Sequence, residues 1–281
     1  MRDDIDYIKF RVDYYCKLSQ GDAQSEFERW VGSFKFKKEM RKHSVYFFDT
    51  YTVMRWFEKD LGFNLRVGDV TKLPEVPSFS KSRPIGEGNK NLTLLKMGKV
   101  RHFNFLRDNI AFKDKENKAI FRLAINNRPH RERFMQLYAD SDFCDAGIVS
   151  ANKKYPTSWV KNKVSMYNHL IFKFIIALEG HDVATNLKWV MSTNSVAVMP
   201  RPKYETWFME GTLVADYHYV EIKDDYSDLK EKMDYYAQHV DEAQKIIDNA
   251  HKFVEQFKNK KREKIISLLV AKKYFEQTNK K

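Results

Sequence analysis

The pattern of apolar and polar positions is clearest in the second half of the chain, where short apolar runs alternate with helical spacing. An apolar run at 171–178 precedes a stretch with apolar residues on one helical face, and a second apolar run follows at 195–199. This order predicts a strand, a helix and a strand. Since strands that alternate with helices form parallel sheets, the sequence predicts an α/β fold. The helical face is marked by Val183, Leu187 and Val190.

The remaining pattern predicts further elements on both sides of this unit. We expect a short helix at 204–210 and a long helix that begins near Ser227. The first 60 residues are predicted to be helical, and the stretch 69–91, which contains prolines and glycines, to be a long irregular connection. Further strands are expected at 63–69, 92–95, 101–106, 119–125, 146–149 and 217–222. Apolar stripes predict C-terminal helices at 229–240 and 243–257.

In a parallel sheet, polar residues that follow the strands are placed to bind a ligand. The carboxyl ends of such strands meet at one edge, and ligands of α/β sheets bind at that edge. Candidates for a ligand site are therefore Glu179, Asn186, Lys188 and His218.

Charge narrows the range of partners. The chain has 281 residues and a formal net charge of +12, so its surface favours nucleic acids, anionic lipid headgroups, nucleotide sugars or phosphorylated glycans. Cys16 and Cys144 are too few for a disulfide framework or a zinc site. With no apolar run of bilayer-spanning length and no signal-peptide pattern, we expect a cytoplasmic protein. The basic segment 258–264 is either a solvated helix face or a contact with an anionic membrane surface.

Four stretches carry a family resemblance. They are VGDVTKLPEVPSFSKSRPI (67–85), LLKMGKVRHFNF (94–105), IFRLAINNRPHRERF (120–134) and the block 171–229, which ends in HYVEIKDDYSDL. By these stretches the chain resembles bacterial members of glycosyltransferase family 90, which includes lipopolysaccharide-core transferases, capsule-associated proteins and protein O-glucosyltransferases.

The resemblance implies an inverting, metal-independent transferase that moves a glucose- or xylose-type sugar from a UDP-sugar to a surface glycan such as lipopolysaccharide core. No cofactor is expected beyond the donor substrate. The partners would be the nucleotide-sugar donor, the glycan acceptor and an anionic membrane surface, with a peripheral position on the inner membrane.

A GT-B-like fold follows from the same resemblance, with two Rossmann-like halves and C-terminal helices that pack across them. We expect an N-terminal, acceptor-side domain at 1–112 and a nucleotide-sugar-binding domain at 113–240. The C-terminal helices would occupy 241–281.

Asp69 is the predicted catalytic base. Sugar transfer requires a base for the acceptor hydroxyl and positive charge for the departing diphosphate. Asp69 follows a predicted strand and precedes the pattern P-x-x-P-S-F-S, where the resemblance implies the family's catalytic aspartate. The alternative is that Asp69 caps a turn.

Basic and aromatic residues are the candidates for donor binding. The basic candidates are Lys81, Arg83, Arg122, Arg131 and Lys188. The resemblance adds Glu205, Trp207, His218 and Tyr219. Trp207 is equally suited to be a core anchor, and Lys188 to be a solvated helix residue.

The chain departs from the family pattern at three positions. Leu123 replaces the glycine of a Phe-Arg-Gly signature, and Ala184 and Asn186 stand where many eukaryotic members carry serine and arginine. These departures leave open a transferase fold that has lost activity and serves as a scaffold.

Two other functions have weaker support. The segments VRHFNFLR and RERFMQLY interleave basic and aromatic residues, as nucleic-acid-binding proteins do. No helix-turn-helix, zinc or RNP pattern is present, so we expect no specific nucleic-acid partner.

Asp140-Ser141-Asp142 matches the D-x-D by which other transferases hold a metal. It does not follow a convincing strand, and no metal site is predicted.

Overall fold

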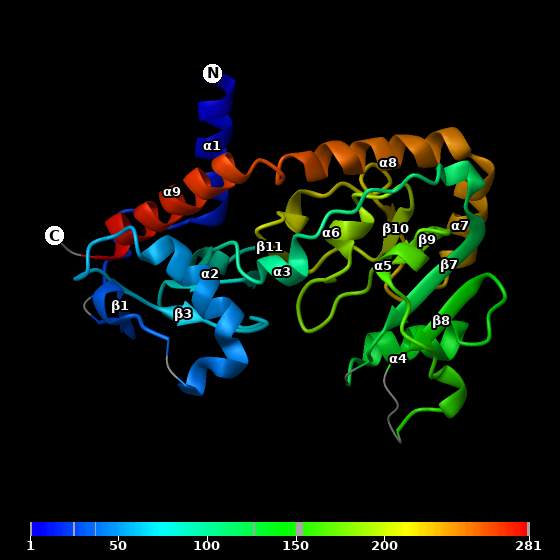
Figure 1. Cartoon of the computed structure of the whole chain (residues 1–281), viewed down its shortest axis with the longest axis horizontal. Helices are drawn as coiled ribbons and strands as arrows, with labels where there is room; N and C mark the ends of the chain where they lie inside the picture. Colours follow the sequence, from blue (N-terminus) through cyan, green and yellow to red (C-terminus); the bar gives the residue numbers. More distant parts are fainter. Residues whose placement is uncertain (1, 25, 37, 126, 150–153, 280–281) are drawn as a thin grey trace.

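The computed structural model describes residues 2–24, 26–36, 38–125, 127–149 and 154–279. Its elements form two groups that lie side by side along the long axis of the molecule (Figure 1). Both groups contain neighbouring strands that run parallel and helices that pack on them. The α/β class predicted from the sequence is therefore confirmed.

The second group is built on a five-stranded sheet in which every neighbouring pair is parallel. The chain starts at the strand next to one edge, adds the edge strand, and then crosses to the other side of the first strand and continues outward. This strand order is that of a doubly wound fold. In spatial order the strands are β12 (Val220–Glu221), β10 (Val196–Met199), β9 (Phe172–Ile176), β7 (Glu116–Leu123) and β8 (Cys144–Ile148).

Helices and short turns connect these strands. The α-helices are α4 (Pro129–Tyr138), α5 (Met166–His169), α6 (Leu187–Val190), α7 (Leu229–Gln238) and α8 (Val240–Glu255). Every residue of β9 and of β10 is buried, as expected for parallel strands covered on both faces. Because side chains alternate along a strand, Phe174 and Ile175 pack into two different apolar clusters.

The first group has shorter strands. A three-stranded parallel sheet has the order β3 (Leu65–Arg66), β4 (Ser78–Ser80) and β6 (Leu92–Leu94), and β1 (Arg29–Trp30) pairs with β2 (Gly62–Phe63). Its helices are α1 (Arg2–Tyr15), α2 (Ser44–Met54) and α3 (Lys99–His102). Helical 3-10 turns occur at Val31–Ser33, Lys38–His43, Asn89–Asn91, Phe112–Asp114, Thr157–Trp159 and Glu210–Thr212.

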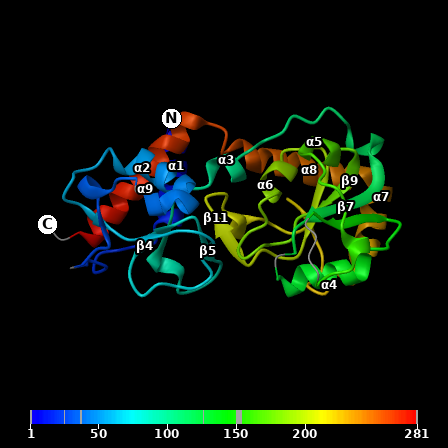
Figure 2. The ribbon, with the colours of Figure 1, turned by 60° about the horizontal axis from the view of Figure 1, so that its bottom comes forward.

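Besides the segment that leads from α3 to β7, two features join the groups. β5 (Ser82–Pro84) from the first group pairs antiparallel with β11 (Tyr204–Thr206) from the second. After α8 the chain returns to the first group, where α9 (Lys260–Thr278) packs against α1 and α2 (Figures 1 and 2). Of the helices that the structure describes, none combines the length and the apolar character needed to cross a bilayer.

The structure confirms one of the predicted units and corrects other predicted elements. The strand–helix–strand prediction at 171–199 is confirmed by β9, α6 and β10. The strand predicted at 101–106 is wrong, because Gly98 adopts a φ of 69° and starts the one-turn helix α3. The helix predicted at 204–210 is also wrong, because pairing with β5 makes 204–206 a strand. Such pairing overrides local propensity. The strand predicted at 217–222 is limited to β12.

A buried carboxylate ties the helices of the first group to the second group. Glu263 of α9 accepts hydrogen bonds from Arg11 of α1 at 2.5 Å, from Lys96 at 2.8 Å and from Trp207 Nε1 at 2.7 Å. Arg11 is fully buried, and its guanidinium lies over the rings of Trp207 and Phe257. Among the described residues, only the carboxylate of Glu263 lies within ion-pair distance of the Arg11 guanidinium. Glu263 therefore neutralises the charge of Arg11.

Replacing Glu263 should destabilise the fold strongly. Glu263→Ala leaves the buried charge of Arg11 uncompensated, and removal of one partner of a buried pair costs about 3–5 kcal/mol. Urea denaturation would measure this loss in the free energy of unfolding. Glu276→Ala on the exposed side of α9 is the control and should change stability by no more than about 0.5 kcal/mol. Equal stabilities of the two variants would contradict the role given to Glu263.

Candidate active site

A cavity of about 710 Å³ lies at the carboxyl ends of β7 and β9. These are the two strands between which the connections of the sheet diverge, and α/β proteins bind their ligands at this position. The second group contributes the ends of both strands and the loop that precedes α6, and the first group contributes Asp69, Lys81, Arg101 and His102. The two groups of the fold thus form opposite walls of one cleft.

The cleft has an excess of positive charge. Its carboxylates are Asp69 and Asp182, and its cationic side chains are Lys81, Arg101, Arg122, Arg128 and Arg131. A concave surface with this balance concentrates anions. It suits a ligand with several negative charges, such as a nucleoside diphosphate.

Asp69 and Lys81, both predicted from the sequence, are in contact. Lys81 is buried, and its Nζ lies 2.5 Å from Asp69 Oδ1 and 2.7 Å from Asp182 Oδ2. Burial would lower the pKa of Lys81, but the charge of Asp182 and other neighbours raises it above its ordinary value. Lys81 is therefore a cation that two carboxylates already neutralise.

This contact keeps Asp69 ionised. Burial alone would raise the pKa of Asp69, but the hydrogen bond and the charge of Lys81 outweigh burial, so the pKa lies below its ordinary value. The Asp69 side chain is 36% exposed, whereas that of Asp182 is 4% exposed. Of these two carboxylates, Asp69 is the one that a second substrate can reach from the cleft.

Two of the predicted arginines line the cleft and also support its walls. Arg131 donates to the carbonyl oxygens of Ala124, Leu178 and Glu179, each at 2.8 Å, and so ties the segment after β7 to the segment after β9. Burial lowers its pKa to about 10, at which it is still protonated at neutral pH. Arg122 pairs with Asp145 of β8.

Asn186 presents an acceptor at the cleft. Its Nδ2 donates to the carbonyl oxygen of Ile176 at 3.0 Å, while its buried Oδ1 has no partner among the described residues. Ala184, one of the positions at which the chain departs from the expected family pattern, is also buried. The helix expected here is the single turn α6, which begins only at Leu187.

Four predicted donor-binding residues lie in the interior and not in the cleft. Lys188 is fully buried, forms an ion pair with Glu210 and lies over the ring of Phe208. The other three belong to the junction of the two groups and are Arg83, Glu205 and Trp207.

At that junction, Arg83 and Glu205 face each other across β5 and β11, with Arg83 Nε 2.7 Å from Glu205 Oε1. Arg83 also donates to the backbone oxygens of Tyr14, Tyr15 and Leu92. Trp207 stacks on Tyr15 with 3.9 Å between ring centroids, as its alternative role of core anchor requires. These side chains are occupied by protein partners.

Glu179, His218 and Tyr219 also lie outside the cleft. Glu179 lines an adjacent cavity of about 270 Å³, and its Oε1 accepts from the backbone N–H of Lys203 at 2.9 Å and of Tyr204 at 3.1 Å. His218 Nδ1 accepts from the N–H of Val214 at 3.0 Å. The buried Tyr219 donates to Glu221 at 2.6 Å.

The structure adds cleft residues that the sequence did not single out. They are Arg101, His102, Arg128, His181, Asp182 and Thr185. Burial, together with the charges of Lys188, Lys81 and Arg101, lowers the pKa of His102 to about 2, so its ring is neutral. Arg101 and His102 belong to the basic-aromatic segment VRHFNFLR (100–107), but only the folding of part of that segment into α3 places them at the cleft.

The D-x-D tripeptide lies away from the cleft. Asp140 and Asp142 follow α4 and precede β8, so they are at the amino ends of the parallel strands. Ligand sites of such sheets lie at the opposite edge. Among the residues that the structure describes, no group of three or more His, Cys, Asp or Glu side chains is placed to hold a metal ion.

A doubly wound sheet with a cationic cleft at its switch point and an ionised aspartate at the opposite wall suits an enzyme that binds a nucleotide. In agreement, residues 95–268 match the family model described as glycosyl transferase family 90, and the chain belongs to this family. It is similar to O-glucosyltransferase LpsA from Dichelobacter nodosus, with 40% identity over 271 residues that cover 95% of this chain and 82% of that protein.

Glu179 should give the stability of the protein a specific pH dependence. Burial raises its pKa from 4.5 to about 7, so the folded protein retains a proton that the unfolded chain has released in this range. Stability should therefore fall as pH rises from 4.5 to about 7, by up to about 3 kcal/mol.

Glu179→Gln, which imitates the protonated carboxyl, tests this. In denaturant melts the variant should match the parent near pH 4.5 and be the more stable protein above pH 7. Glu276→Gln, on the exposed side of α9, should follow the parent at every pH. If the free energies of unfolding of Glu179→Gln and of the parent differed by the same amount at every pH, the raised pKa of Glu179 would be contradicted.

Proposed function

We propose that the protein is an inverting, metal-independent glycosyltransferase that moves a sugar from a UDP-sugar to a surface glycan such as lipopolysaccharide core. The observation that supports this most is the placement of ionised Asp69 on one wall of a cationic cleft at the switch point of the sheet. Family membership and the O-glucosyltransferase relative favour glucose over xylose as the transferred sugar.

Asp69 is the proposed base. It would take the proton of an acceptor hydroxyl, whose oxygen then attacks the anomeric carbon on the face opposite the diphosphate. As this bond forms, the bond between the anomeric carbon and the diphosphate oxygen breaks, and UDP leaves with the electron pair. Lys81 would act as a positioning residue, because its two carboxylate partners leave it little charge for a phosphate.

The remaining cleft residues would bind the donor. Arg101 and Arg128 would stabilise the negative charge that develops on the diphosphate, whereas Arg122 is held by its ion pair with Asp145 and would add to the positive potential of the wall. Asn186, through its unpaired Oδ1, would accept a hydrogen bond from the sugar or the uracil. Since Arg131 uses its donors on three backbone oxygens, we assign it to the support of the cleft wall.

The domain arrangement is part of the proposal. The two groups of elements correspond to the acceptor side and the donor side of a GT-B-like enzyme, with boundaries near 112 and 240 and with the C-terminal helices crossing between them. An acceptor of the proposed kind is anchored in a membrane, so the enzyme would work at the cytoplasmic surface of the inner membrane.

Donor binding should not require a metal. Calorimetry in the presence of EDTA should show UDP binding, and added Mg²⁺ or Mn²⁺ should not increase its affinity. Binding that appears only with metal would contradict the metal-independent proposal. UDP binding without hydrolysis or transfer for any of a panel of UDP-sugars would favour the inactive scaffold.

Asp69→Asn should abolish most of the turnover. The amide keeps the shape of the carboxylate but cannot take a proton, so the rate should fall roughly 10²- to 10⁴-fold. The affinity for UDP should stay within a few-fold, because Asp69 is on the wall opposite the arginines of the sheet.

The matched control is Asp142→Asn, an exposed aspartate at the other edge of the sheet, which should keep parental turnover. Release of sugar product from the UDP-sugar is the measurement. Turnover of Asp69→Asn close to that of the parent would remove Asp69 from the mechanism.

A further inference from the structure

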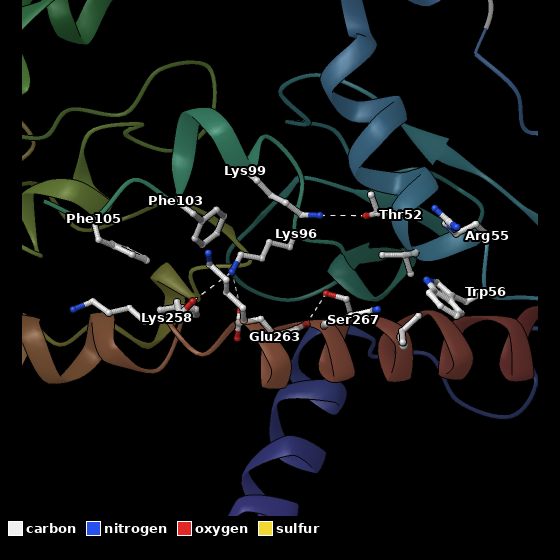
Figure 3. Close-up of a pocket in the computed structure, with 15 residues that line it drawn as sticks. Thr52, Arg55, Trp56, Lys96, Lys99, Phe103, Phe105, Lys258, Glu263 and Ser267 are labelled. Carbon is white, nitrogen blue, oxygen red and sulfur yellow. Dashed lines mark hydrogen bonds and ion pairs between the residues drawn. The ribbon is translucent and has the colours of Figure 1, made fainter.

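A second cavity, of about 630 Å³, lies between α2, α3 and α9, outside the donor cleft (Figure 3). We call it the α2–α9 groove. Apolar side chains form much of its lining, and these are Val53, Trp56, Phe103, Phe105, Phe257 and Leu268. Basic side chains surround them, and these are Arg55, Lys96, Lys99, Lys258, Lys260 and Lys264. Glu263, the carboxylate in this lining, is buried and paired with Arg11 and Lys96.

Three of the six basic side chains of the groove have ion-pair partners: Lys96 with Glu263, Lys99 with Asp49 and Lys258 with Glu255. The charge on its rim along α9 is less compensated. Within the part of the chain that the structure describes, no ion pair includes Lys260, Lys261 or Lys264. Lys264 Nζ lies 4.7 Å from the ring centroid of Trp56, and Arg55 lies 5.7 Å from it. Trp56 is 59% exposed, which is a large apolar surface among cations.

The outer face of α9 continues this combination. Ile265 and Leu269 are four residues apart, so they lie on one face of the helix, and both are exposed. Lys261 and Lys272 are at compatible spacing on the same face. Two exposed apolar residues between lysines, next to an exposed tryptophan, offer a membrane surface both apolar side chains and positive charge.

The groove is close to the donor cleft. The one-turn helix α3 separates them: Lys99 and Phe103 line the groove, whereas Arg101 and His102 line the cleft. A surface that contacts the groove would therefore lie beside the proposed site of transfer.

We propose that the α2–α9 groove and the outer face of α9 dock the protein on an anionic lipid bilayer. The lysines would contact lipid phosphates, and Trp56 would enter the headgroup region. A bilayer surface supplies both the negative charge and the apolar layer that the exposed side chains require. The docking goes beyond the proposed transfer reaction and can be measured without turnover.

Vesicle sedimentation with the full-length protein tests the proposal. The protein should bind vesicles of mixed phosphatidylcholine and phosphatidylglycerol, bind pure phosphatidylcholine much less, and be released by salt. In Lys260→Glu/Lys264→Glu the partition coefficient should fall roughly 10-fold or more, since each basic residue near an anionic surface strengthens binding about fivefold.

Lys113→Glu/Lys118→Glu is the matched control, because these lysines are exposed and belong to the group with the five-stranded sheet. It changes the net charge equally but should bind almost as the parent does. Trp56→Ala should bind more weakly and lose the fluorescence shift that vesicles cause in the parent. Unchanged melting temperatures would show that the variants fold.

The proposal is overturned if the parent does not bind anionic vesicles, if it binds neutral vesicles equally well, or if the two double variants lose binding equally. Hydrolysis of the UDP-sugar in solution should be the same in all these variants, because none of the altered residues lines the cleft. Failure of docking and failure of the proposed function are thus separate results.

Discussion

Buried ion pairs, within each of the two groups and at their junction, hold together the segments around the cleft. Arg83 with Glu205, Lys188 with Glu210 and Arg11 with Glu263 are almost completely inaccessible to solvent. A buried charge is tolerated only beside its partner, so the segments that carry these charges must be in place together. Those segments are α1, β5, α6, β11, α9 and the turn after β11. The walls of the cleft are therefore positioned by charges that no ligand reaches.

This explains which parts of the site could be predicted. Asp69 follows a strand and a recognisable pattern, and periodicity alone located the strands whose ends meet at the cleft. Lys188, by contrast, has the local sequence of a surface lysine, and its partner Glu210 lies in a turn whose position depends on β11. Since β11 forms by pairing with a strand about 120 residues earlier, no local pattern indicates it. Basic residues used by the fold and basic residues used for ligands look the same in a sequence.

The net charge of the chain indicated which classes of partner to expect, but not where on the molecule they would bind. Two sets of basic residues line cavities on opposite sides of α3, one in the cleft of the five-stranded sheet and one in the α2–α9 groove. The cleft combines cations with carboxylates that orient them, as a site for a defined small substrate requires. The groove combines cations with exposed apolar side chains, and Lys260 and Lys264 have no carboxylate partner among the described residues, as a contact with an extended and fluid surface requires.

Because α9 packs on the N-terminal group, it affects the order in which the parts of the chain can fold during synthesis. Arg11 finds its carboxylate some 250 residues later, in a helix that ends near the last described residue. During synthesis α1 therefore lacks both the partner of Arg11 and the apolar side chains that pack against it until α9 has been made. The five-stranded sheet contains no residue of α1 or α9, so it can fold before this partner arrives. The N-terminal group is completed only after α9 has been made, and the wall of the cleft that this group provides is completed with it.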